Sequence, residues 1–127
     1  MSDTVTDGIR IQVKPAFWPE RSQVEAGQWA FTYTVTIINE GPRVATLRTR
    51  HWLITDATGH VEEVQGPGVV GKQPRLEPGE RFEYTSWAML KTPFGTMRGS
   101  YQMERDDRST FDAHIGEFAL TQPHALN

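Results

Sequence analysis

Three glycines and a lysine form the pattern in this chain that is most typical of ligand binding. The segment reads Gly66-Pro67-Gly68-Val69-Val70-Gly71-Lys72, which fits G-x-G-x-x-G and most of G-x-x-x-x-G-K. Both patterns bind phosphate by aiming backbone N–H groups and a helix N-terminus at the anion, so each requires a helix directly after the last glycine. Here two prolines four residues apart follow, which leaves room for one helical turn at most. The sequence therefore predicts no dinucleotide-binding helix and no P-loop.

Two interpretations of this glycine loop remain open. In the structural interpretation, the glycines provide positive φ angles or close backbone approach in a connection between strands. In the functional interpretation, successive N–H groups cradle an anion without a helix, and a nearby cation such as Lys72 or Arg75 assists them. The candidate residues for binding an anion or a nucleotide are Gly66, Gly68, Gly71, Lys72, Arg50 and His51.

A second candidate surface lies in the segment Arg48-Thr49-Arg50-His51-Trp52. On a regular strand, Arg48, Arg50 and Trp52 share one face, and Thr49 and His51 share the other. Two guanidinium groups beside an indole can bind an anionic or aromatic ligand or a protein partner. The alternative is an ordinary solvated face on which Trp52 covers the arginine stems.

The histidines do not predict a metal site. His60-x-Glu62 and Asp112-x-His114 each place two possible ligands on one strand face. Neither pair has a third ligand nearby in the sequence, and a stable site usually needs three or four. We therefore predict neither a metal site nor a cofactor.

The sequence also contains no recognisable catalytic arrangement. Ser86 and Ser100 lie in predicted strands, and the chain has no G-x-S-x-G motif. Adjacent carboxylates such as Glu62 and Glu63 point apart on a strand and match no general acid–base pair. No catalytic residue is predicted, and we expect a protein that is not an enzyme.

The composition limits the class of protein. The 127 residues fit a single domain, with 13 Lys and Arg, 16 Asp and Glu, a net charge of −3 and no cysteine. Mild acidity argues against general binding of nucleic acid. The absence of cysteine excludes disulfides and thiolate metal sites. No secretory signal and no membrane-spanning stretch is visible, so we expect a cytoplasmic protein without membrane insertion.

Polar and apolar residues alternate along most of the chain, which is typical of β-strands. Seven strands are predicted, at residues 9–14, 29–37, 46–56, 60–65, 81–87, 96–105 and 111–120. No segment has a helical apolar period. The strands and their regular turns predict an all-β fold, an antiparallel β-sandwich of the immunoglobulin or fibronectin type III kind. The ordered part is expected to span about residues 9–120 between loose terminal tails. The aromatic residues that alternate in register are expected in its core, namely Phe31, Tyr33, Phe82, Tyr84, Tyr101 and Phe118.

Several local sequences together resemble the bacterial ApaG family, which is also called CorD. They are Phe31–Ile37, Arg50–Asp56, Glu63–Gly71, Gln73-Pro74, Pro78-Gly79-Glu80, Tyr84-Thr85-Ser86 and Gly95–Tyr101. The resemblance runs in order from about Ile11 to Leu120. One departure is Trp87, where relatives usually have glycine.

The resemblance implies a sandwich of the fibronectin type III kind. It also implies a link to cobalt and magnesium handling and to diadenosine tetraphosphate metabolism. Similar domains in larger eukaryotic proteins imply a protein-binding role. The glycine loop of the family has been discussed as a pyrophosphate-binding element.

Three functional hypotheses follow. The first is a non-catalytic module that binds an unidentified protein partner through the glycine loop, through Arg48, Arg50 and Trp52, or through a sheet edge. The second is a sensor that holds a nucleotide or polyphosphate on the glycine loop. The third is a nucleotide hydrolase, which is the least favoured because no base, nucleophile or metal cage is recognisable.

Overall fold

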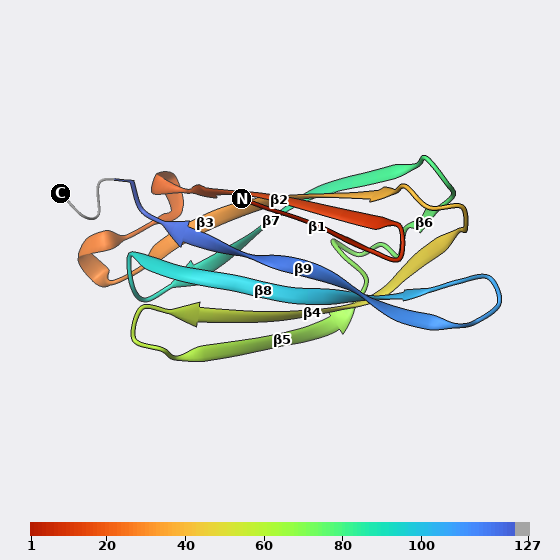
Figure 1. Ribbon diagram of the computed structural model, residues 1–127. Coiled ribbons are helices and arrows are strands. Elements are labelled where there is room, and N and C mark those ends of the chain that lie inside the picture. The colour runs from red at the N-terminus through yellow and green to blue at the C-terminus, as the bar shows by residue number, and fades with distance from the viewer. Residues whose placement is uncertain (124–127) are drawn as a thin grey trace.

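β-Branched and aromatic residues that alternate with polar ones form nine strands in the computed structural model, which describes residues 1–123 (Figure 1). Two short 3-10 helices, η1 (Pro19–Arg21) and η2 (Val24–Ala26), join the second strand to the third. The strands are β1 (Ser2–Thr6), β2 (Ile9–Phe17), β3 (Trp29–Asn39), β4 (Ala45–Asp56), β5 (Val61–Pro67), β6 (Arg75–Leu76), β7 (Arg81–Leu90), β8 (Phe94–Glu104) and β9 (Thr110–Thr121).

The strands form two antiparallel sheets that pack face to face. One sheet has the order β1-β2-β3-β7, and the other has the order β5-β4-β8-β9 with β6 paired to β4. Figure 1 shows β5, β4, β8 and β9 side by side as one layer. The predicted all-β antiparallel sandwich is confirmed, and all seven predicted strands are present. The additional strands are β1 and the two-residue β6.

The predicted loose N-terminal tail is wrong. Residues 2–6 form β1, which pairs with β2 along its whole length. Asp7 and Gly8 connect the two strands with φ angles of 47° and 83°, the positive values that a two-residue type I′ hairpin requires. Asp-Gly is a strong hairpin signal, and it is the feature that the seven-strand prediction missed.

The predicted C-terminal tail begins later than expected. Thr121 is the last residue of β9. The Gln122 backbone N–H donates to the Pro93 carbonyl, and its side-chain Oε1 accepts from Trp29 Nε1 at 2.8 Å. The rest of the predicted tail, residues 124–127, lies outside the described residues.

The core lies between the two sheets and is rich in aromatic side chains. Trp52 is 2% exposed and packs edge-on against Tyr33, Tyr101 and Phe118, with ring centroids 5.3, 6.2 and 6.0 Å away. The predicted core positions are confirmed, because Phe31, Tyr33, Tyr84, Tyr101 and Phe118 are buried and Phe82 is partly buried.

The two long sides of the sandwich differ. On one side β1 packs against β9, where Thr4 Oγ1 donates to the His114 carbonyl and the His114 N–H donates to Thr6 Oγ1. On the other side are β5 and β7. Among the described strands, β5 pairs with β4 alone and β7 pairs with β3 alone. The sandwich is therefore closed along β1 and β9 and open along β5 and β7.

A hydrogen bond between two tyrosines connects the sheets inside the core. The hydroxyls of Tyr84 on β7 and Tyr101 on β8 contact each other, and within residues 1–123 neither has another partner. Burial raises the pKa of both hydroxyls well above the usual value for tyrosine. Both groups therefore remain protonated, and each relies on the other to satisfy its hydrogen-bonding capacity.

We expect Tyr84→Phe or Tyr101→Phe to lower the free energy of unfolding by about 1–3 kcal/mol, because each change leaves one buried hydroxyl without a partner. The double variant is expected to lose less than the sum of the two single changes. Chemical denaturation of the four proteins measures this coupling. Additive losses would show that the two hydroxyls are satisfied independently.

Candidate functional site

A β-bulge in β4 determines which side chains face the core. Leu47 lies opposite Met103 and Thr49 lies opposite Gln102, so Arg48 is an extra residue in β4. Before the bulge Leu47 faces inward, and after it the inward positions shift by one and Trp52 is buried. The alternation of inward and outward side chains therefore shifts by one residue between the two parts of β4.

The predicted surface of Arg48, Arg50 and Trp52 is wrong, because the bulge separates its members. Arg48 is exposed on the outer side and forms an ion pair with Glu104 at 2.8 Å. Arg50 is half-buried and Trp52 is buried, and both face the other sheet. A strand without a bulge would have placed all three on one face, as the sequence predicted.

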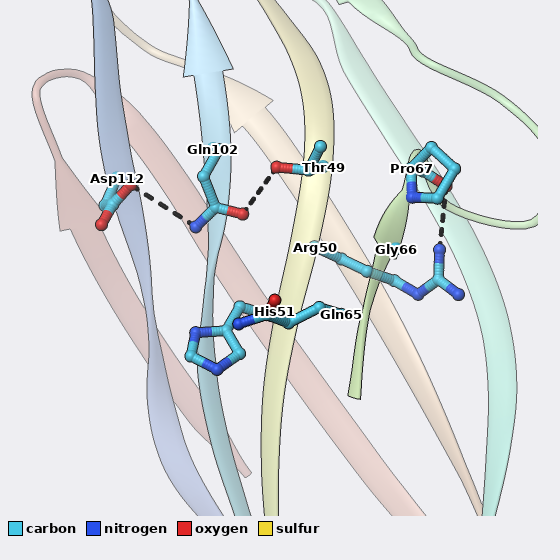
Figure 2. Close-up of a pocket in the computed structure, with 8 residues that line it drawn as sticks. All are labelled: Thr49, Arg50, His51, Gln65, Gly66, Pro67, Gln102 and Asp112. Carbon is cyan, nitrogen blue, oxygen red and sulfur yellow. Dashed lines mark hydrogen bonds between the residues drawn. The ribbon is translucent and has the colours of Figure 1, made fainter. Parts of the chain in front are cut away.

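The outer face of β4 borders a polar pocket of about 580 Å³, shown in Figure 2. Thr49 Oγ1 donates to Gln102 Oε1 at 2.8 Å, and Gln102 Nε2 contacts Asp112 Oδ1 at 3.4 Å. His51 and Gln65 lie beside this row, and Arg50 extends away from them toward Pro67. We refer to this hollow as the outer pocket; it is lined by Thr49, Arg50, His51, Gln65, Gly66, Pro67, Gln102 and Asp112.

His51 is engaged by a carboxylate next to the outer pocket. Its Nε2 lies 2.5 Å from Glu63 Oε2 on β5. Ser100 on β8 is directly opposite His51 but does not bond to it; its Oγ accepts from Gln102 Nε2 at 3.0 Å. A nucleophilic serine needs a hydrogen bond to its base, so this row is not arranged for acyl transfer.

Arg50 bonds to the glycine loop with one nitrogen. Its Nη1 donates to the carbonyls of Pro67 and Gly68, both at 2.9 Å. Gly66 lies directly opposite Arg50, and a Cβ at Gly66 would come within 3.0 Å of Nη2. The missing side chain at Gly66 therefore makes room for the guanidinium. Within the described residues, no carboxylate forms an ion pair with Arg50.

The glycine loop is a tight turn whose N–H groups are mostly used within the chain. Val69 and Lys72 exchange backbone hydrogen bonds of 2.8 and 2.9 Å around Val70 and Gly71, whose φ angles are 44° and 79°. These are type I′ values, and valine adopts them rarely. The Gly68 N–H donates to the Arg48 carbonyl at 2.8 Å. As the sequence predicted, no helix follows; the next element is β6.

The structure thus separates the predicted anion-binding residues into two groups. Arg50 contacts the loop, and Lys72 belongs to the turn itself. His51 faces the opposite side of the sheet and pairs with Glu63. Binding of phosphate by this loop stays a prediction.

Sequence reasoning missed a hollow on the open side of the sandwich. We name it the edge crevice; its volume is about 380 Å³. The sequence could not predict this hollow, because its position depends on which strands lie at the edges of the two sheets. It is lined by Tyr33, Arg50, Trp52, Ile54, Glu62, Val64, Ser86, Trp87, Ala88 and Met89.

Exposed apolar side chains border the edge crevice. Trp87 is 54% exposed and Met89 is 38% exposed, and both lie on β7. Trp18 packs edge-on against Trp87 with ring centroids 6.5 Å apart. Large exposed aromatic residues are enriched at protein–protein interfaces.

Within residues 1–123, no group of three or more His, Asp or Glu residues is placed to hold a metal ion. In the same residues, no helix is long and apolar enough to cross a membrane.

These features define a two-sheet β-sandwich with a polar outer pocket and one open side. The chain belongs to the ApaG family, because residues 19–105 match the ApaG domain. It is 55% identical to Protein ApaG of Anaeromyxobacter dehalogenans strain 2CP-C over 127 residues, which is all of both chains.

Solved structures agree with this assignment. A crystal structure from Bordetella pertussis that carries the name ApaA protein is 46% identical, with a TM-score of 0.89, and the match covers 91% of this chain and 94% of that one. The C-terminal domain of wzt shares the fold at 10% identity, with a TM-score of 0.56 over 94% of this chain and 76% of that domain.

We expect Gly68→Ala to destabilise the protein more than Gly71→Ala does. Both glycines have positive φ angles, but a Cβ at Gly68 would lie 2.3 Å from the Lys72 carbonyl oxygen, whereas the space at Gly71 is open. Both variants carry a backbone strain of about 1 kcal/mol from the positive φ angle, so the difference between their losses of stability measures the clash at Gly68. Thermal and chemical unfolding measure both variants. Equal losses would contradict the close backbone approach at Gly68.

Proposed function

We propose that this protein is a non-catalytic binding module that mediates protein–protein interaction. The observation that supports the proposal is the open side of the sandwich, where two unpaired edge strands, β5 and β7, flank the edge crevice. An unpaired edge presents a row of N–H and C=O groups that can hydrogen-bond to an added strand. Peptide recognition by strand addition combines these main-chain bonds with pockets for alternate side chains.

The polar residues outside the edge crevice support a non-catalytic role. His51 is held by Glu63, and the Ser100 hydroxyl is bonded to Gln102 rather than to a base. Thr49, Gln102 and Asp112 also bond among themselves. Side chains that satisfy one another in this way suit a stable surface better than a reaction centre.

The binding of a nucleotide or pyrophosphate by the glycine loop is a second candidate function, and one observation favours it. Within the described residues, the N–H groups of Val70 and Gly71 donate to no acceptor, and Lys72 follows directly after Gly71. Two such N–H groups beside an ammonium can hold a phosphate oxygen. A divalent ion such as magnesium or cobalt would then arrive with the phosphate rather than on protein ligands, in keeping with the family's association with these ions.

The second candidate predicts saturable NMR shifts in labelled protein titrated with ATP or diadenosine tetraphosphate in the presence of magnesium. The shifts should be confined to residues 66–72, and Lys72→Ala should weaken binding by about tenfold because a charge-assisted contact is lost. Lys14→Ala, which removes an exposed lysine from β2 in the other sheet, is the control. The absence of shifts at millimolar ligand would exclude this function.

The leading proposal predicts that a partner protein protects β7 from hydrogen exchange. Affinity capture from a cell lysate, with Trp87→Ser/Met89→Ser as the comparison bait, identifies the partners that require this surface. Each partner is then purified and mixed with the wild-type protein. Amides of β7 or β5 that are unpaired in the free protein should exchange more slowly in the complex, whereas the amides of β3, which has strands on both sides, should change little.

Two results would contradict strand addition. One is a partner that both baits retain equally well. The other is a complex in which protection appears on β8 and β9 and not on either edge strand.

A further inference from the structure

Arg50 places a cation at one end of the edge crevice, and no carboxylate of residues 1–123 pairs with it. Its side chain is half-buried, and its Nη1 donates to the carbonyls of Pro67 and Gly68. Within residues 1–123, Nε and Nη2 donate to no acceptor. These two nitrogens form the fork that binds a carboxylate through two parallel hydrogen bonds. A partly buried charge is costly to leave unpaired, so this end of the edge crevice favours an anionic group.

Glu62 carries the opposite charge at the other end. Glu62 lies opposite Ile54, and Gly66 lies opposite Arg50, so four residues separate the two positions along both strands. At about 3.3 Å per residue these two backbone positions lie roughly 13 Å apart along the strands. Glu62 is exposed and forms no ion pair within the described residues. This end therefore favours a cationic group.

The wall between these two positions includes apolar side chains. Val64 lies midway, opposite Trp52, Ile54 lines the Glu62 end, and Ala88 lines the wall from β7. An extended peptide turns every second side chain to the same face, so residues i, i+2 and i+4 of a bound strand would all face this wall. Residues i and i+4 would also lie roughly 13 Å apart, which matches the spacing of the backbone positions of Arg50 and Glu62 along the strands.

We infer that the edge crevice binds an extended segment of a partner protein in which an acidic and a basic side chain lie four residues apart with an apolar side chain midway between them. The acidic side chain pairs with Arg50, the basic one pairs with Glu62, and the apolar one packs on Val64. The inference rests on the proposed function and specifies the chemistry of its partner. It assigns Arg50 to recognition of a carboxylate rather than of a phosphate on the glycine loop.

The test is a selection from a displayed library of random twelve-residue peptides against the full-length protein. Enriched peptides are synthesised, and their affinities are measured by fluorescence anisotropy for the wild type, Arg50→Gln and Glu62→Gln. Arg48→Gln is the matched control, because it removes the same charge from the same strand on the outer face. Hydrogen exchange locates each peptide on β5 and β7. Arg50→Lys, which keeps the charge but loses the fork, serves if Arg50→Gln fails to fold.

The expected result is enrichment of acidic and basic residues at i and i+4. Replacing the acidic residue of the peptide by its amide should weaken binding at least tenfold to the wild type and to Arg48→Gln, but less than about twofold to Arg50→Gln. The corresponding change at the basic residue should lose its effect in Glu62→Gln.

Two other outcomes are distinguishable. Peptides that protect β5 or β7 without this charge spacing, or whose acidic residue matters equally in Arg50→Gln, would overturn the inference and leave the proposed function standing. Failure to enrich any peptide that protects either edge strand would overturn both.

Discussion

The β-bulge at Arg48 is the constraint on which the arrangement of both candidate surfaces depends. One extra residue in β4 shifts the inward positions, so Trp52 enters the aromatic core and Arg50 turns toward the opposite sheet. Without it, the regular alternation of a strand would bring His51 inward and place Trp52 in water. The bulge also directs the Arg48 carbonyl toward the glycine loop, where it accepts from the Gly68 N–H.

The glycine loop and Arg50 form one structural unit. Gly66 leaves space for the guanidinium, Gly68 permits close approach to the Lys72 carbonyl, and Gly71 completes a type I′ turn. Val69 anchors the unit in the core. Each glycine of the pattern therefore has a local steric reason. A match to G-x-G-x-x-G is accounted for here without a phosphate, although the turn still presents two N–H groups at its tip.

The sequence predicted the fold well because strand periodicity is a local property. The alternation in residues 29–37 identified β3, and the aromatic residues in register identified the core. The placement of Arg50 and Trp52 could not be predicted in the same way. The bulge depends on how β4 pairs with β8, and no residue type in the segment from Arg48 to Trp52 predicts it. The edge crevice could not be predicted either, because it depends on the order of the strands, and that order is a property of the whole sheet.

The open side has a further consequence for how the protein behaves at high concentration. An unpaired strand can pair with the same strand of a second copy, which is the usual route to edge-to-edge aggregation. Glu62 and Glu63 on β5 oppose such pairing by like-charge repulsion. The stretch of β7 from Thr85 to Leu90, which carries Trp87 and Met89, contains no charged residue. In the proposed complex a bound segment would cover that end, so the contact that we propose would also block edge-to-edge pairing of two copies.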